Sequence, residues 1–112
     1  MQNDEEKRRL PRWVKRVLVT YTTLEGEKVS EQAVTQNISE GGLQLVLVHQ
    51  LEIGELIDTK IELVHDSIPI FATCKVSYVK YQDGTHQTGL QFVKIEDFQR
   101  ERLGRYLIRY KE

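Results

Sequence analysis

The chain has 112 residues, a formal net charge of −1 and a single cysteine. This length suits one domain, which can bury a core without a metal or a disulfide. One cysteine excludes an intramolecular disulfide and favours a reducing compartment. No apolar run reaches membrane-spanning length, and residues 1–9 lack the apolar segment of a signal peptide. These features predict a cytoplasmic protein without a membrane partner.

The N-terminus concentrates the positive charge of the chain. Residues 1–13 are polar, charged and interrupted by Pro11, which predicts a flexible basic leader. Residues 1–16 carry six basic and three acidic side chains, a sum of +3, so residues 17–112 must carry −4. Local charge of this kind favours a binding site over a cationic surface for nucleic acid, although a solvated charged tail is the simpler alternative.

Residues 14–112 contain a series of short strand-like segments separated by turns. Apolar and polar side chains alternate in β-branched and aromatic stretches. The dipeptide Asp83-Gly84 favours a hairpin. Several short strands at regular spacing predict a small barrel or sandwich. The predicted strands are residues 17–22, 28–37, 43–48, 56–64, 68–81 and 88–93.

The fifth predicted strand alternates without interruption, so two sets of side chains oppose each other across it. One set comprises Phe71, Thr73, Lys75, Ser77 and Val79, and the other comprises Ala72, Cys74, Val76, Tyr78 and Lys80. The cysteine of this strand is expected to be a small buried hydrophobe.

The hydrophobic period changes near the C-terminus. Leu103, Tyr106, Leu107 and Tyr110 follow the i, i+3, i+4, i+7 spacing of an amphipathic helix, and Asp97 is a suitable N-cap. One amphipathic helix after a run of strands must bury its apolar face on the sheet, which would close one mouth of a barrel.

Two short motifs carry the chemistry, and the first is Arg8-Arg9-Leu10-Pro11-Arg12. Guanidinium groups bind phosphate oxygens in pairs, match the O6/N7 edge of guanine and stack on purines. The proline disfavours a helix at the residue before it, so the arginines lie on an extended or turning segment. Such a cluster can recognise both the phosphate and the base of a guanine nucleotide.

The second motif is Asn37-Ile38-Ser39-Glu40-Gly41-Gly42, a turn between two predicted strands. The amide of Asn37 can donate and accept along a base edge, and Ser39 adds a hydroxyl. Gly41 and Gly42 allow positive φ and close approach of a ligand to the backbone. The structural alternative is a tight turn in which the asparagine and serine bond only to their own backbone.

In this order and spacing, the two motifs resemble the R-x-x-x-R and [D/N]-x-S-x-x-G motifs of the PilZ domain, a bacterial receptor family for cyclic di-GMP. The residues Val17-x-Val19-x-Tyr21 and Gly89-Leu90-Gln91-Phe92 also match, so the resemblance covers nearly the whole chain. It implies a mainly β fold: a six-stranded antiparallel β-barrel with a C-terminal α-helix over residues 14–112, preceded by the flexible basic leader.

The resemblance also implies a site for cyclic di-GMP. The arginines would clamp phosphates and one guanine, and the second motif would hold the other guanine side. Arg12-Trp13-Val14-Lys15-Arg16 repeats the arginine spacing, which leaves open whether Arg16 replaces Arg8 in the first motif. The implied ligand-binding residues are Arg8, Arg9, Arg12, Asn37, Ser39, Gly41 and Gly42.

The implied function is that of a receptor that changes its N-terminal conformation on binding cyclic di-GMP and signals to a protein partner in motility, biofilm or virulence control. We expect no enzymatic activity, cofactor or metal, because no catalytic constellation is discernible and His49, His65 and His86 lack ligand spacing. No nucleic-acid partner is expected. A nucleotide-independent PilZ-like adaptor in pilus or flagellar machinery is the alternative. A small RNA-binding barrel is disfavoured, since no strand face interleaves aromatic and basic residues.

Overall fold

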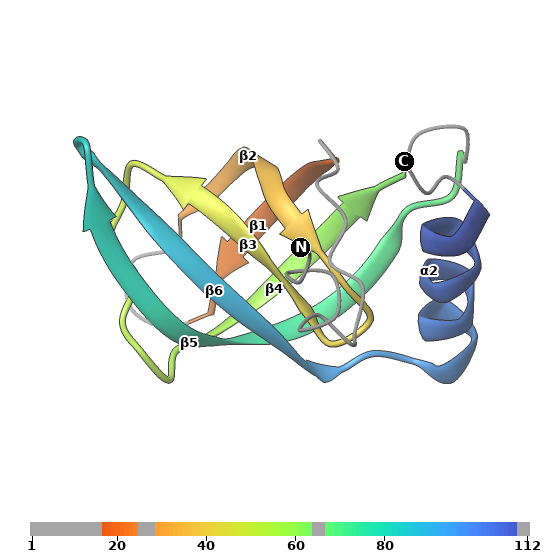
Figure 1. Ribbon diagram of the computed structural model, residues 1–112. Coiled ribbons are helices and arrows are strands. Elements are labelled where there is room, and N and C mark those ends of the chain that lie inside the picture. The colour runs from red at the N-terminus through yellow and green to blue at the C-terminus, as the bar shows by residue number, and fades with distance from the viewer. Residues whose placement is uncertain (1–16, 25–28, 64–66, 110–112) are drawn as a thin grey trace, which may run out of the picture.

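The structure, a computed structural model, describes residues 17–24, 29–63 and 67–109, and the predicted leader lies outside them. In the described part, six strands form one closed antiparallel barrel with a helix at one end (Figure 1). The strand order is β1, β2, β3, β6, β5, β4, and β4 pairs with β1 to close the circle. The elements are β1 Leu18–Thr23, β2 Ser30–Ile38, β3 Gly42–Leu47, β4 Leu56–Glu62, β5 Ile70–Gln82, β6 Thr85–Lys94 and α2 Asp97–Arg109.

This architecture confirms the predicted six-stranded barrel with a C-terminal helix. The predicted hairpin is present, with φ of 55° at Asp83 and 82° at Gly84, as a type I′ turn requires. Because this turn uses two residues, pairing between β5 and β6 begins at once with Gln82 opposite Thr85. β6 therefore starts three residues earlier than the sequence pattern predicts.

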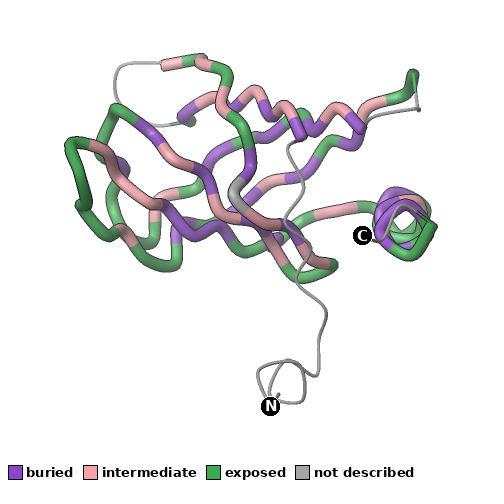
Figure 2. The backbone as a smooth tube through the Cα atoms, turned by 45° about the horizontal axis from the view of Figure 1, so that its top comes forward, coloured by how far each residue is buried: buried purple, intermediate pink, exposed green. Residues whose placement is uncertain are grey.

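Buried residues alternate along the strands (purple in Figure 2), and their side chains fill the barrel interior. Val19, Tyr21, Leu45, Ile57 and Cys74 have no exposed surface. Full burial of an aliphatic or aromatic side chain of this size contributes about 1.5–3 kcal/mol, so the interior supplies the main stabilisation of the fold. The expectation that the cysteine is a buried hydrophobe is confirmed.

The alternation in β5 is interrupted by a β-bulge, which corrects the prediction of an unbroken pattern. Val76 pairs with Leu90 and Tyr78 with Gly89, which leaves Ser77 as an extra residue. Val76 is fully buried, Tyr78 is exposed, and the valine that follows the tyrosine packs against the core. The prediction that Tyr78 shares a face with Val76 was wrong, because one inserted residue reverses which positions face the interior.

A second bulge has the same effect in β2. Thr35 pairs with Leu45 and Asn37 with Gln44, so Gln36 is the extra backbone position. The threonine is buried, and so is the isoleucine that follows Asn37. The bulge therefore places Asn37 on the outer face of the barrel, whereas uninterrupted alternation would direct it into the core.

The turn between β2 and β3 needs a glycine at position 42 for a reason that differs from the expected one. Neither Gly41 nor Gly42 has a positive φ. A Cβ atom on Gly42 would lie 2.0 Å from the carbonyl oxygen of Leu90, whereas one on Gly41 would lie 3.9 Å from its nearest neighbour, the Ser39 hydroxyl. Close backbone packing against β6, rather than turn conformation, therefore excludes a side chain at Gly42.

Helix α2 packs against the barrel through one apolar face, as predicted. Leu103 is fully buried and Leu107 nearly so. The helix begins at Asp97, and the Arg100 backbone amide donates to the Glu96 carbonyl at 2.9 Å. Glu96, rather than the predicted Asp97, therefore occupies the N-cap position. With 13 residues, α2 is too short to cross a bilayer, and no other described helix is long and apolar enough to do so.

The burial of Cys74 generates a prediction about its reactivity. Burial raises the pKa of the thiol from an ordinary 9.0 to about 12, so the reactive thiolate is scarce at pH 8. We expect Ellman's reagent at pH 8 to modify the folded protein far more slowly than the unfolded chain. Since the pKa is higher in the folded state, stability should fall as the pH rises from about 9 towards 12. Equal modification rates before and after unfolding would contradict this.

The close packing of Gly42 generates a prediction about stability. Gly42→Ala places a methyl group against the Leu90 carbonyl, so it should lower the free energy of unfolding by about 1–3 kcal/mol, the usual cost of overpacking. Gly41→Ala is the matched control, because its methyl group has ordinary space. Urea denaturation of both variants measures the difference. Equal stability of the two would show that the backbone shifts freely at this point.

Candidate functional site

A shallow groove of about 200 Å³ on the outer face of β2, β3, β6 and β5 contains the predicted turn motif. Larger hollows among the described residues, such as those of about 450 and 650 Å³, lie elsewhere and include none of the predicted site residues. We therefore take the smaller groove as the candidate site, on the basis of its chemistry rather than its volume. Its lining residues are Asn37, Ser39, Gly41, Gly42, Leu43, Gln44, Ser77, Tyr78, Gly89, Leu90 and Gln91.

A chain of three side-chain amides orients Asn37 in the groove. The Asn37 Nδ2 donates to Gln44 Oε1 at 3.0 Å, and the Gln44 Nε2 donates to Gln87 Oε1 at 3.2 Å. No described residue donates to Asn37 Oδ1, so this oxygen can accept from a ligand. Asn37 bonds to a neighbouring strand rather than to its own turn, so the structural alternative does not hold for this residue.

Ser39, in contrast, bonds within its turn. Its hydroxyl donates to the Gly42 carbonyl at 3.4 Å and accepts from the Gly41 amide at 3.2 Å, while its backbone amide donates to the Gly42 carbonyl at 2.9 Å. A hydroxyl has two acceptor lone pairs, so one stays available for a ligand donor. The serine therefore shapes the turn and retains one position for recognition.

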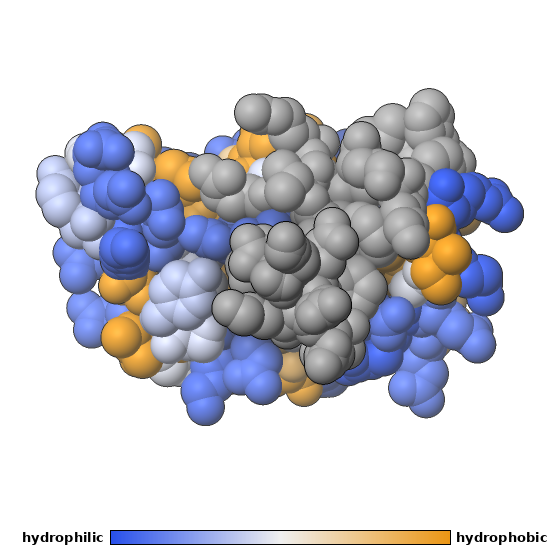
Figure 3. All heavy atoms as spheres, in the orientation of Figure 1, coloured by the Kyte–Doolittle hydropathy of each residue, from blue (hydrophilic) through white to orange (hydrophobic). Residues whose placement is uncertain are grey.

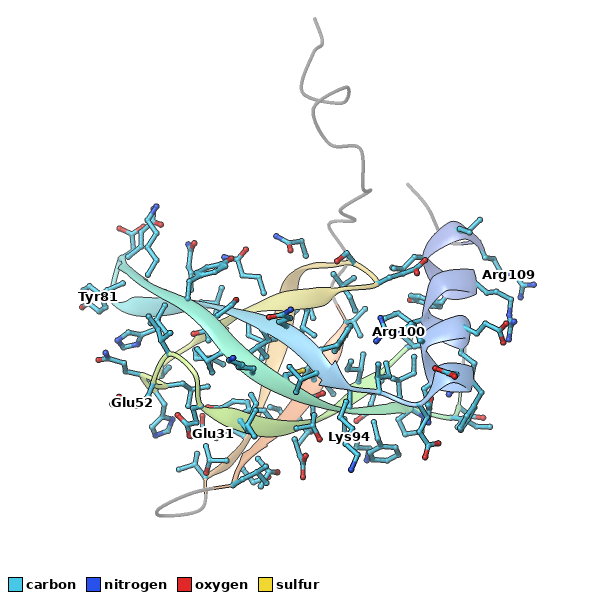
Figure 4. The ribbon with its side chains drawn as sticks, turned by 90° about the horizontal axis from the view of Figure 1, so that it is seen from below. Glu31, Glu52, Tyr81, Lys94, Arg100 and Arg109 are labelled. Atoms are coloured by element: carbon cyan, nitrogen blue, oxygen red, sulfur yellow. The ribbon has the colours of Figure 1, made fainter. Side chains whose placement is uncertain are left out.

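Helix α2 supports this turn from outside. Arg100 points from α2 towards the barrel, whereas Arg109 points away from it (Figure 4), and the Arg100 Nη1 donates to the Glu40 carbonyl at 3.2 Å. The Glu40 carboxylate lies over Gly104, where an added Cβ would be 2.9 Å from Oε2. The turn and the helix are therefore in direct contact.

Sequence reasoning missed seven of the eleven lining residues, and also Gln87, which helps to orient them. Asn37, Gln44, Gly89 and Tyr78 are direct cross-strand neighbours on β2, β3, β6 and β5, so they form one row across the outer face. A glycine inside a predicted strand is a signal of close approach by another group, and that signal was available at position 89. The missed lining residues are Leu43, Gln44, Ser77, Tyr78, Gly89, Leu90 and Gln91.

The predicted arginines Arg8, Arg9 and Arg12 lie outside the described residues, and so does Arg16. The first described residue, Val17, is fixed beside β2: its amide donates to the Thr35 hydroxyl at 3.0 Å, and its carbonyl accepts from the Thr35 amide at 3.0 Å. The segment that carries the arginines therefore joins the barrel beside Thr35, which lies two positions before Asn37 on β2.

The groove is lined mainly by polar side chains and glycines. On the coloured part of the face in Figure 3, hydrophilic residues predominate and apolar side chains form small separate groups. Among the described residues, no group of three or more His, Cys, Asp and Glu side chains could hold a metal ion. The described groove thus offers amides, a hydroxyl, exposed backbone and an aromatic ring, which suit a polar ligand with planar rings.

Solved structures share this fold. The chain is similar to the Bacillus subtilis inhibitor of motility MotI/DgrA, with 20% identity, a TM-score of 0.74 and coverage of 92% of this chain and 50% of that one. It is also similar to MrkH of K. pneumonia in complex with cyclic di-GMP, with 17% identity, a TM-score of 0.73 and coverage of 97% and 52%. MrkH is described as a cyclic di-GMP-dependent transcription regulatory factor. The chain spans about half the length of these proteins.

No curated protein matches the chain. The family comparison is decisive instead, because residues 6–109 match the PilZ domain, and this match includes both predicted motifs as well as the barrel and the helix. The chain belongs to the PilZ domain family.

Proposed function

We propose that this chain is a receptor for cyclic di-GMP, bound in the groove beside the Asn37–Gly42 turn and held from the other side by the arginines of the leader. The observation that carries the proposal is the position of Asn37: a β-bulge places it on the outer face, and the amide chain leaves its Oδ1 as an acceptor. Membership of a family that binds cyclic di-GMP supports the same ligand.

The attachment of the leader is compatible with this arrangement. An extended chain advances at most about 3.6 Å per residue, so Arg12, five residues before Val17, can reach about 18 Å from that point. Asn37 lies two positions beyond Thr35, the partner of Val17, which corresponds to about 7 Å along β2. The arginines of the first motif are therefore within reach of the groove.

The chemistry of the ligand matches the groups that the site provides. Guanine carries N–H donors on its pairing edge, and the Asn37 Oδ1 can accept hydrogen bonds from them. The Ser39 hydroxyl keeps one lone pair for a further ligand donor. Arginine side chains bind phosphate oxygens in pairs. The proposed assignment gives phosphates and one guanine face to Arg8, Arg9 and Arg12. The other guanine side is assigned to the turn motif, with Gly41 and Gly42 permitting close approach.

The PilZ domain is a binding and regulatory domain, so we assign this chain a receptor role without catalysis. We propose that ligand binding rearranges the leader and presents a new surface to a protein partner, as in motility or biofilm control. The absence of a nucleic-acid partner stays a prediction, because MrkH is described as a transcription regulatory factor. Cytoplasmic location also stays a prediction.

Calorimetric titration with cyclic di-GMP tests the proposal, and separate titrations with GTP and cyclic di-AMP serve as comparisons. Saturable binding of cyclic di-GMP alone is the expected result. A nucleotide-independent adaptor would show no saturable binding of any of the three.

The first-motif arginines should contribute most of the affinity. Arg8→Ala or Arg12→Ala removes a charge-assisted contact worth about 1.5–3 kcal/mol, so each should weaken cyclic di-GMP binding at least about tenfold. Both residues precede the described barrel, so the melting temperature should not change. Arg16→Ala is the matched control, since it removes the same charge next to the barrel. Wild-type affinity in both variants would refute the assignment, and a loss confined to Arg12→Ala and Arg16→Ala would establish the alternative register.

Amide hydrogen exchange tests the proposed switch. If the ligand pins the leader beside the turn, protection should appear in residues 7–16 and 37–42 on adding cyclic di-GMP and stay small in α2. Binding should also weaken at high salt, because several exposed cation–phosphate contacts form together. A leader that exchanges equally fast with and without ligand would exclude this switch, even if the nucleotide binds.

A further inference from the structure

The row of residues across the groove places an aromatic ring opposite the proposed base-reading amide. Asn37 and Gly89 lie on β2 and β6 with Gln44 on β3 between them. Adjacent strands are about 4.8 Å apart, so Gly89 is about 10 Å from Asn37 across the sheet. Tyr78 follows on β5 as the partner of Gly89. A single purine nucleotide held by its edge at Asn37 can therefore extend as far as Tyr78.

The ring of Tyr78 lies flat on Gly89. A Cβ atom added to Gly89 would be 2.1 Å from Tyr78 Cε2 and 2.5 Å from both flanking ring atoms, Cδ2 and Cζ. These two equal, short distances place the added atom beneath the face of the ring, because approach along the ring edge would make both of them longer. The ring thus has one face towards the glycine and the other directed away from it.

The outer face of this ring is available for contact. Tyr78 is 43% exposed although it lies against the sheet, while Gly89 beneath it is buried. The glycine leaves the space in which the ring lies, so the ring can occupy this position before any ligand arrives. An exposed aromatic face is the kind of platform on which nucleic-acid bases stack.

We propose that Tyr78 is the stacking platform for a guanine base of the ligand, while Asn37 reads the edge of the base. This assignment rests on the proposed binding of cyclic di-GMP and adds a residue outside both sequence motifs. Stacking tolerates any base, whereas an acceptor at Asn37 favours the N–H donors of guanine. Tyr78 therefore contributes affinity, and Asn37 contributes the choice of base.

The competing explanation is structural. An aromatic ring laid over a strand glycine stabilises a sheet by itself, whether or not a ligand binds. That role alone would make Tyr78→Ala lower the melting temperature and leave the dissociation constant unchanged. The two roles are therefore separated by measuring binding and stability on the same variants.

The test compares four variants of the full chain by calorimetry with cyclic di-GMP and by thermal melting. Tyr78→Ala should weaken binding about tenfold, within the range measured for loss of one base–aromatic stack. Tyr78→Phe should bind like the wild type. Gly89→Ala keeps the tyrosine but displaces its ring, so it should also weaken binding. Tyr81→Ala is the control, since Tyr81 is 67% exposed on the same strand but lies at the end of the barrel away from α2 (Figure 4) and outside the groove.

The outcomes distinguish this inference from the function on which it rests. Unchanged affinity in Tyr78→Ala, together with loss in Arg12→Ala, would overturn the stacking role and leave cyclic di-GMP binding in place. Failure of Tyr78→Phe to retain affinity would assign the effect to the hydroxyl and also overturn stacking. Absence of saturable binding by the wild type would refute both. If Gly89→Ala does not fold, the contrast between alanine and phenylalanine at position 78 decides alone. An upfield shift of the bound guanine H8 resonance that disappears in Tyr78→Ala would support the assignment directly.

Discussion

Closure of the barrel is the constraint on which the rest of this structure depends. Because six strands pair around a complete circle, each strand must direct alternate side chains into the interior. A residue that this alternation would direct inward can therefore face outward only if the strand contains an extra residue. β2 has such an extra residue just before Asn37, and β5 has one just before Tyr78. The apolar residue after Asn37 and the one after Tyr78 pack in or against the core. Both bulges thus place a polar or aromatic group in the groove without breaking the packed interior.

The groove is also connected to the helix. The β2–β3 turn is fixed internally by the Ser39 hydroxyl and externally by α2, through the bond from Arg100 and the contact of Gly104 with Glu40. A ligand that displaces this turn would act on groups that the helix touches directly. The turn is therefore a physical link between the outer face of the barrel and the C-terminal element, and it depends on a glycine in the middle of the helix.

The sequence alone was sufficient for the features that depend on local chemistry. The Asp83-Gly84 turn was predictable because few residues adopt two successive positive φ angles. The barrel strands and the amphipathic α2 were predictable because burial on one side imposes a period on the sequence. The turn motif Asn37–Gly42 could be found from its residue types and spacing, and it does line a groove. The arginine motif was found in the same way and lies outside the described residues.

The tertiary structure alone decided the features that depend on a neighbouring strand. No local pattern marks Ser77 or Gln36 as extra residues, because a bulge is defined by the register of the partner strand. Gly42 must be glycine because the Leu90 carbonyl, 48 positions later in the chain, occupies the space of its side chain. Sequence thus determined which residues are available for binding. The pairing of distant strands determined which of them face the same groove, since a side chain acquires its direction only when its strand has a partner.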